Sequence, residues 1–229
     1  VGEPRLPTSD HHNITPVLTI AQNLRPASVL EIGCGFGKYG VLLREYLDIW
    51  YERYERTTWR TRIEAVEAFP AYRTPVWDYV YDRVHLGDAA AVVPTLGRYD
   101  LILACDVVEH LDKPAAVRLV DACLDHAAVL IISTPREFYA QDEHNLNPFE
   151  VHRCLWTAAD FPAGTYVATV GVLSCDVFVA SRTPLSEAVL YPADPRDVLY
   201  LRSRNRLKRL GAPGWLLSRM LRWLNRALA

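Results

Sequence analysis

A chain of 229 residues, half of them apolar, is long enough for one α/β domain with a sizeable core and too apolar for an intrinsically disordered protein. No apolar run reaches the roughly 18–20 residues of a membrane-spanning helix, and the first residues lack the charged-then-apolar pattern of an export signal. The five scattered cysteines form no C-x-x-C pair. We therefore expect a cytoplasmic protein with reduced thiols. The formal net charge is −2, but residues 1–197 carry 17 basic and 27 acidic side chains, whereas residues 198–229 carry eight basic and no acidic ones.

The predicted elements alternate between helices and strands. A first helix is predicted at 14–24, with Asn13 as its N-cap, and an apolar strand follows at 28–33. A helix from 38 to about 54 is followed by strands at 62–69 and 83–88 and by a helix at 89–96. The apolar run at 99–106 is typical of a parallel strand covered on both faces, and a helix at 114–126 leads into a strand at 127–134. Two β-rich runs at 165–170 and 175–180 are too close for a helical crossover and predict an antiparallel hairpin.

This alternation predicts one doubly wound α/β domain over residues 1–182. We expect a mostly parallel, Rossmann-like sheet of about seven strands that ends in the antiparallel hairpin. Ligands of such sheets bind at the carboxyl ends of the strands. The glycine-rich turn at 33–37 and the segments that follow the later strands should therefore surround one crevice.

The turn after the first strand carries four glycines in the stretch VLEIGCGFGKYG, Val29–Gly40. From Gly35 it reads G-x-G-x-x-G, which is typical of dinucleotide-binding enzymes but weak when it occurs alone. From Glu31 it reads E-x-G-x-G-x-G, with Gly33, Gly35 and Gly37 as the three glycines. The first register would bury Glu31 without a partner, at a cost on the order of several kcal/mol. The second places Glu31 near the end of the strand, where a cationic ligand would stabilise it.

In this second register the sequence resembles the class I S-adenosylmethionine-dependent methyltransferases over about residues 28–161. The resemblance implies that Glu31 helps to bind the ammonium group of the cofactor's methionine moiety and that the glycines let the backbone approach the cofactor closely. It also implies that Glu67, at the end of the second strand, binds the ribose hydroxyls. Asp88, followed by Ala89, matches the residue that accepts a hydrogen bond from the adenine amino group. Asp106 is assigned to the same cofactor site and lies in the matching stretch YDLILACDVVEHL.

The position of the ribose-binding carboxylate departs from the usual spacing. Glu67 lies 30 residues after Gly37, against about 20 in the usual nucleotide-binding pattern. An aromatic and charged stretch accounts for the excess and is expected to extend the preceding helix and its loop. Glu64 is a rival ribose ligand at an earlier place in the strand, and we prefer Glu67.

Methyl transfer to a hydroxyl requires alignment of the acceptor and removal of its proton. The segment after the fifth strand resembles the S-x-P-N to N-P-x-H-x-R region of several sugar and natural-product methyltransferases, in which a histidine is the base or orients the acceptor. Glu150 stands at the position of that histidine, Arg136 replaces the asparagine, and His152 is the nearest imidazole. An ordinary imidazole, with a pKa near 6.5, is suited to this proton transfer at neutral pH.

We therefore predict O-methylation of a small molecule, either a saccharide or a secondary metabolite, with His152 as the general base and His110 as the next candidate. Purely structural roles are the alternative, with Glu109 and His110 holding a loop or helix end and His152 fixing its own segment. The acceptor wall is expected in the regions 50–59 and 138–155. We predict no metal for this general-base reaction.

Two other function classes are open. Small-RNA 2′-O-methyltransferases carry E-x-x-E-H and a later histidine that hold a divalent metal, and here Asp106, Glu109, His110 and His152 could fill those places. The first ligand would be an aspartate instead of a glutamate, and no RNA-end-binding domain is recognisable. A non-catalytic, cofactor-binding scaffold is the third class.

The basic residues of 198–229 predict a helical C-terminal extension over residues 183–229. Within it, residues 214–228 are amphipathic at helical spacing, with three arginines on one stripe and leucines opposite. Such a helix could pack on its own acidic domain or on a second copy in a homodimer, which we favour. It could also lie on an anionic membrane surface. We do not expect nucleic acid as its partner.

Overall fold

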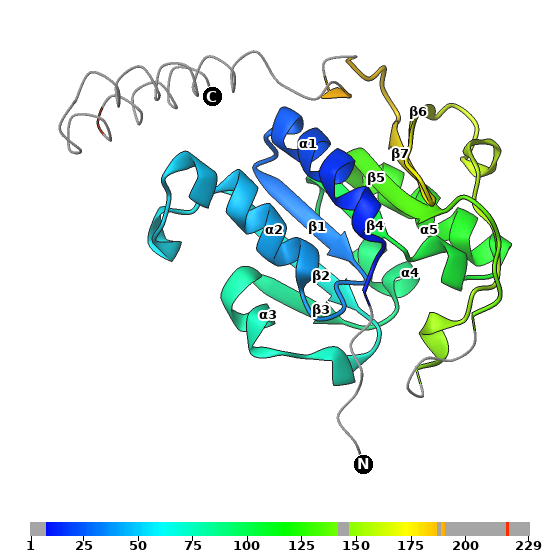
Figure 1. The fold of residues 1–229 in the computed structure, drawn as a ribbon, viewed down its shortest axis with the longest axis horizontal. Coiled ribbons are helices and arrows are strands. Elements are labelled where there is room, and N and C mark those ends of the chain that lie inside the picture. Colours follow the sequence, from blue (N-terminus) through cyan, green and yellow to red (C-terminus); the bar gives the residue numbers. More distant parts are fainter. Residues whose placement is uncertain (1–7, 142–146, 187–188, 191–218, 220–229) are drawn as a thin grey trace.

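Seven strands form a single sheet in the order β3-β2-β1-β4-β5-β7-β6 (Figure 1). The computed structural model describes residues 8–141, 147–186, 189–190 and 219. Strands β1 to β5 pair in parallel, and β7 runs antiparallel to both β5 and β6. The mostly parallel sheet and its terminal hairpin are thus confirmed. The strands are β1 (Ser28–Ile32), β2 (Arg62–Glu67), β3 (Arg83–Leu86), β4 (Tyr99–Cys105), β5 (Ala127–Pro135), β6 (Tyr166–Gly171) and β7 (Cys175–Ser181).

Helices cover both faces of the sheet. α1 (Ile14–Leu24), α2 (Lys38–Leu47) and α3 (Pro75–Val80) pack on one face, and α4 (Ala89–Val92) and α5 (Lys113–His126) pack on the other (Figure 1). Neighbouring strand residues point to opposite faces, so Val29 belongs to the first core and Leu30 to the second. Because both faces are buried, the central strands are mostly apolar, as the sequence suggested, and their buried polar residues, Glu31, Ser133 and Thr134, lie toward the carboxyl ends.

The strand order reverses beside β1. The chain moves outward from β1 through β2 to β3, and then returns to place β4 on the other side of β1. The loops that leave the carboxyl ends of β1 and β4 therefore diverge and open a crevice between them.

The second helix is shorter than predicted. It ends at Leu47 instead of about residue 54, and a 3-10 turn (Ile49–Tyr51) follows it. The cause is Asp48, whose fully buried carboxylate accepts hydrogen bonds from Arg44 of α2 (2.7 Å), Arg53 (2.8 Å) and the backbone N–H of Arg60 (2.8 Å). The chain folds around this carboxylate instead of continuing as a helix.

The first helix begins after Asn13, as predicted, but the Asn13 side chain has a different role. Asn13 makes no side-chain cap, because a 3-10 turn (His11–Asn13) precedes α1 and is capped by Asp10. The buried Asn13 amide instead donates to Ser133 Oγ of β5 at 2.8 Å and accepts a hydrogen bond from the Tyr39 hydroxyl of α2. Asn13 therefore connects the start of α1 to β5 and α2 through side-chain hydrogen bonds.

The predicted extension at 183–229 lies almost wholly outside the described residues, so its amphipathic helix, the homodimer and the membrane contact stay predictions. Among the described residues, no helix has the length and apolar character needed to cross a bilayer.

Candidate active site

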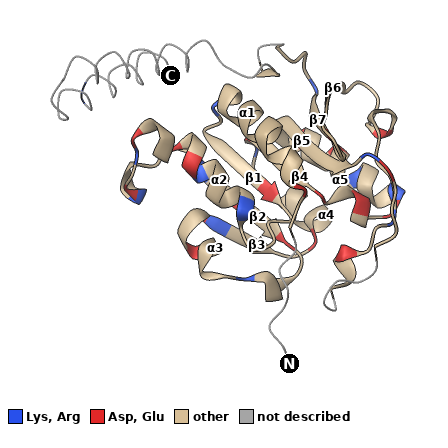
Figure 2. Ribbon diagram, viewed as in Figure 1, with Lys and Arg blue, Asp and Glu red and all other residues tan. Residues whose placement is uncertain are grey.

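A cavity of about 510 Å³ opens at the carboxyl ends of the parallel strands. Its volume lies within the range of about 300–1,000 Å³ that is typical of small-molecule sites. Acidic positions gather at the end of β1 and in the loops beside it (Figure 2). The structure brings nine of the ten predicted site residues to this cavity: Glu31, Gly33, Gly35, Glu67, Asp88, Ala89, Asp106, His110 and His152.

The glycine turn after β1 is shaped by close contacts. Gly33 has φ +69°, and a Cβ there would lie 2.8 Å from the Val107 side chain, so the position requires glycine on both grounds. Gly37, the tenth predicted residue, does not line the cavity. It precedes α2 with φ +103°, and a Cβ there would lie 3.0 Å from Val76 of α3. Gly37 therefore serves the packing of the turn.

Glu67 fixes the other side of the turn. Its carboxylate accepts hydrogen bonds from the backbone N–H groups of Gly35 (2.8 Å) and Phe69 (2.9 Å). Burial nevertheless raises the pKa of Glu67 above its usual value. Carboxylate oxygens can accept further bonds beyond these two. The rival Glu64 does not line the cavity, since its carboxylate is held by Arg62, His85 and Tyr99.

Glu31 is a buried carboxylate on the cavity wall. Its side chain is 3 % exposed, and burial raises its pKa to about 8, with the nearby Glu67 charge adding to the rise. The Tyr81 hydroxyl donates to it at 2.7 Å, and Lys38 favours its charged form. A cationic ligand group in the cavity would complete this environment.

Asp88 and Ala89 stand at the cavity edge. The exposed Asp88 carboxylate caps α4 by accepting from the Ala90 N–H at 2.8 Å.

Asp106 follows β4 with φ +55°, a left-handed conformation that is uncommon outside glycine. Its carboxylate accepts from the backbone N–H of Asp10 (3.1 Å) and from Ser133 Oγ (3.2 Å). Burial raises the pKa of Asp106 to about 6. Asp106 thereby ties the segment before α1 to the end of β4.

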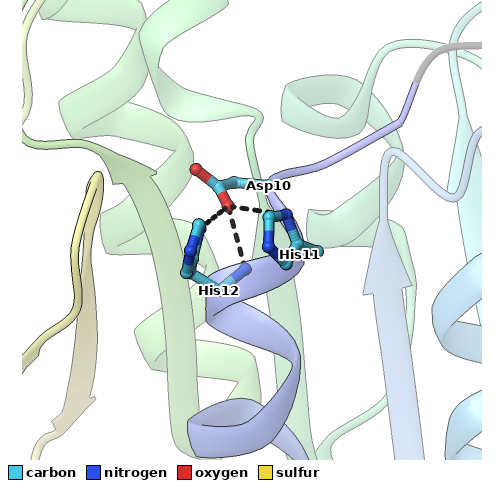
Figure 3. Close-up of side chains that lie close together, drawn as sticks. All are labelled: Asp10, His11 and His12. Atoms are coloured by element: carbon cyan, nitrogen blue, oxygen red, sulfur yellow. Dashed lines mark hydrogen bonds and ion pairs between the residues drawn. The ribbon is translucent and has the colours of Figure 1, made fainter.

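The segment before α1 forms part of the cavity wall, which the sequence did not suggest. Thr8, Ser9 and Asp10 line the cavity, and the Lys38 ammonium donates to the Ser9 carbonyl at 2.9 Å. Figure 3 shows the Asp10 carboxylate between His11 and His12, with His12 Nδ1 at 2.8 Å. These bonds and one from Ser174 lower the pKa of Asp10 to about 2 against the effect of burial. An aspartate before a predicted helix was the available signal, since such residues cap helices.

Three residues predicted as acid–base or metal-binding groups meet on the cavity wall. Glu109, His110 and His152 each offer an oxygen or nitrogen atom within 4.8 Å of the others. Glu109 is 2 % exposed, and neither of its carboxylate oxygens has a hydrogen-bond partner, so burial raises its pKa well above the usual value. Burial lowers the pKa of His110 to about 4, which leaves this imidazole neutral at pH 7. Asp106 does not join this cluster, because its carboxylate is engaged as described above.

His152 is oriented by its own segment. Its Nδ1 lies 3.0 Å from the Tyr139 carbonyl, and the Tyr139 ring packs edge-on against the imidazole. A hydrogen on Nδ1 satisfies that carbonyl and leaves the lone pair on Nε2. Two further bonds hold the segment, from Gln141 Nε2 to the Glu150 carbonyl (2.8 Å) and from the Tyr72 hydroxyl to the Glu150 carboxylate (2.9 Å).

A sequence-family profile described as a methyltransferase domain matches residues 10–163. The chain belongs to the class I S-adenosylmethionine-dependent methyltransferases. The matched range contains every residue of the cavity described above except Thr8, Ser9, Ser174 and Cys175.

Solved structures of other methyltransferases share the fold of this one. The N-terminal domain of EvdMO1, crystallised with S-adenosylhomocysteine and D-fucose, is 17 % identical, with a TM-score of 0.52 over 77 % of this chain and 85 % of that one. Magnesium protoporphyrin IX methyltransferase from Synechocystis PCC 6803 is 14 % identical, with a TM-score of 0.53 over 75 % and 82 %. The methyltransferase domain of the bacterial protein CtHen1 is 17 % identical, with a TM-score of 0.51 over 74 % and 97 %. No match is found among curated proteins.

The cofactor of the methyltransferase is S-adenosylmethionine, and the cavity fits it. The buried Glu31 carboxylate suits a cationic amino group, Glu67 has remaining acceptor capacity for hydroxyls, and Gly33 permits close approach of a ligand to the backbone. The predicted acceptor wall stays a prediction, and the two regions named for it differ in their place relative to the cavity. Residues of 138–155 line the cavity, but none of the residues 50–59 does. That stretch instead packs beside α3, where Arg56 donates to the carbonyls of Asp78 (2.7 Å) and Tyr79 (3.0 Å).

Proposed function

We propose that this methyltransferase methylates a hydroxyl oxygen of a small molecule, such as a saccharide or a secondary metabolite, with His152 as the general base. The observation that carries the proposal is the orientation of His152. Its Nδ1 faces a backbone carbonyl, and the ring lines the same cavity as the cofactor residues. An imidazole held in this way presents Nε2 as a proton acceptor.

The proposed step uses the cavity residues as follows. When bound, the cofactor supplies an electrophilic methyl group on a sulfonium. His152 Nε2 takes the proton of the acceptor hydroxyl as its oxygen forms the bond to the methyl carbon. Loss of the methyl group would leave the cofactor as a neutral thioether, so the net positive charge would end on the His152 imidazolium. Glu109 offers a carboxyl oxygen within 4.8 Å of a His152 nitrogen, close enough to favour that charge when the carboxyl is ionised.

The charges of the cavity favour a neutral or cationic acceptor. Among the described residues that line it, seven carry carboxylates and one, Lys38, carries an ammonium group. Burial favours the protonated forms of Glu31 and Glu109, but the remaining carboxylates still outnumber the one ammonium group. Such a wall disfavours phosphates, whereas nucleic-acid binding depends on cationic side chains. Tyr139 and Phe149 are 53 % and 45 % exposed at the cavity and offer flat surfaces for a sugar or another ring. D-fucose in the crystals of the EvdMO1 domain supports a sugar-sized acceptor on this fold.

Labelled methyl groups test the proposal. The purified protein is incubated with S-adenosylmethionine carrying a labelled methyl group and a cell extract separated into small-molecule and RNA fractions. The proposal predicts label in the small-molecule fraction, as an ether that mass spectrometry can locate. Label confined to RNA would refute it.

A second candidate is a metal-assisted methyltransferase, which the cluster of Glu109, His110 and His152 favours. One carboxylate and two imidazoles suit Mn²⁺, Fe²⁺ or Zn²⁺. Neither carboxylate oxygen of Glu109 has a hydrogen-bond partner, and one of them belongs to this cluster. Chelator treatment separates the candidates. The general-base reaction should survive it, whereas the metal-assisted reaction should stop and return with Mn²⁺.

A further inference from the structure

Tyr81 is a buried residue that contacts the cofactor site without lining the cavity. It lies at the end of α3, its side chain is 2 % exposed, and it does not line the cavity. Its hydroxyl donates to Glu31 Oε2 at 2.7 Å, and Glu31 does line the cavity. Tyr81 therefore cannot contact a bound cofactor and can act on one only through the Glu31 carboxylate.

The position of Tyr81 depends on Gly40 in the first turns of α2. A Cβ at Gly40 would lie 2.4 Å from Tyr81 Cζ and 2.6 Å from its hydroxyl oxygen. Glycine inside a helix costs about 0.5–1 kcal/mol relative to alanine. The close approach of the Tyr81 ring explains why α2 carries glycine at this place, since alanine would displace the phenol from Glu31.

A buried carboxylate needs a fixed partner to present its charge in one direction. Described groups that act on Glu31 are the Tyr81 hydroxyl, the backbone N–H of Gly40, the Lys38 ammonium and the Glu67 carboxylate. Of these, Lys38 is bound to the Ser9 carbonyl, and Glu67 repels the negative charge. The Tyr81 hydroxyl is thus the neutral side-chain donor that holds Oε2 of Glu31, and it acts beside the fixed backbone N–H of Gly40.

We propose that Tyr81 is a positioning residue for the cofactor, which acts by holding Glu31 toward the amino group of the methionine moiety. The inference rests on the assignment of Glu31 to that amino group, which the resemblance to class I methyltransferases implies, and it is independent of the acceptor. Removal of the phenol hydroxyl should weaken ligands that carry the amino acid moiety and spare those that lack it.

Two ligands separate these effects in calorimetry. S-adenosylhomocysteine carries the amino acid moiety, whereas 5′-methylthioadenosine keeps the adenosine and sulfur but lacks it. We expect Tyr81→Phe to weaken the first about tenfold and the second less than twofold. Gly40→Ala should give the same selective loss, because it displaces the same ring. Tyr79→Phe is the matched control, since Tyr79 is 58 % exposed on the same helix, and it should change neither affinity.

The outcome also depends on Glu31 itself. Glu31→Gln should cause the same selective loss, and adding Tyr81→Phe to it should cost less than a further twofold, because both act on one contact. An equal loss of both ligands in Tyr81→Phe, or no loss, would overturn the proposal. These measurements need no acceptor, so failure of the proposed hydroxyl methylation would leave the result readable. If Glu31→Gln is itself not selective, the assignment of Glu31 fails and the role of Tyr81 fails with it.

Discussion

The buried carboxylate of Glu31 makes the stability of the cofactor-free protein depend on pH. Its side chain is 3 % exposed, and burial raises its pKa from 4.5 to about 8. The folded state therefore holds this proton more tightly than the unfolded state does. The stabilisation is fully present below pH 4.5 and is lost as the pH rises to about 8. At 1.36 kcal/mol for each unit of pKa, the loss is at most about 5 kcal/mol.

Glu31→Gln removes this titration while keeping the size of the side chain and an oxygen that can accept from Tyr81. We expect the free energy of unfolding of the variant, minus that of the wild type, to rise by up to about 5 kcal/mol between pH 4.5 and pH 8. Urea unfolding at five or more pH values in this window measures the difference. Other groups that titrate here, such as Asp106 with a pKa of about 6, cancel in the subtraction.

Two controls accompany the measurement. Glu45→Gln, at an exposed position of α2, should give a difference that does not change with pH. Saturating S-adenosylhomocysteine should reduce the rise, because an ammonium group beside Glu31 favours its charged form. A difference between wild type and Glu31→Gln that stays constant from pH 4.5 to pH 8 would refute the reasoning.

Three other perturbations have expected outcomes. Glu67→Gln should weaken the binding of both S-adenosylhomocysteine and 5′-methylthioadenosine by about 1–3 kcal/mol in calorimetry, because a charge-assisted acceptor is lost. The control Glu64→Gln lies away from the cavity and should leave both affinities unchanged. Gly33→Ala should lower the free energy of unfolding by about 1–3 kcal/mol in urea titration, since its φ of +69° and the Val107 contact both oppose a Cβ; unchanged stability would contradict that account. Asp48→Asn should cost about 1–3 kcal/mol of unfolding free energy, because the buried Arg44 guanidinium loses its closer charged partner at 2.7 Å and keeps only Asp82 at 3.4 Å. A loss below about 1 kcal/mol would show that the Arg44–Asp48 pair contributes little.

The sequence predicted the sheet well because its signals are local. Continuous apolar runs mark strands that are buried on both faces, and the short spacing between the last two β-rich runs marks the hairpin. The end of α2 was not predictable in this way. It depends on Asp48, whose partners Arg53 and Arg60 come from the following loop and are not visible as a helix signal.

The candidate site was predictable where a motif names its residues. The glycine turn, Glu67 and the acidic and imidazole residues after β4 and β5 all reach one cavity because parallel strands end at the same edge of a sheet. Tyr81 and the segment from Thr8 to Asp10 were missed. Tyr81 is 50 residues from Glu31 in the sequence, and only the tertiary packing of α3 on the sheet brings the Tyr81 hydroxyl to Glu31 of β1.

Turnover and cofactor affinity of His152→Ala, measured together, test the general-base role of His152 most directly. Single-turnover methyl transfer is followed with the acceptor that labelling identifies, and the affinity for S-adenosylhomocysteine is measured in parallel. His126→Ala, at the end of α5 and away from the cavity, is the control. If His152 is the general base, the transfer rate should fall by about 10²–10⁴, which is the usual rate contribution of general acid–base catalysis. The affinity for S-adenosylhomocysteine should change less than twofold. A His152→Ala enzyme that transfers methyl groups at the wild-type rate would contradict this role.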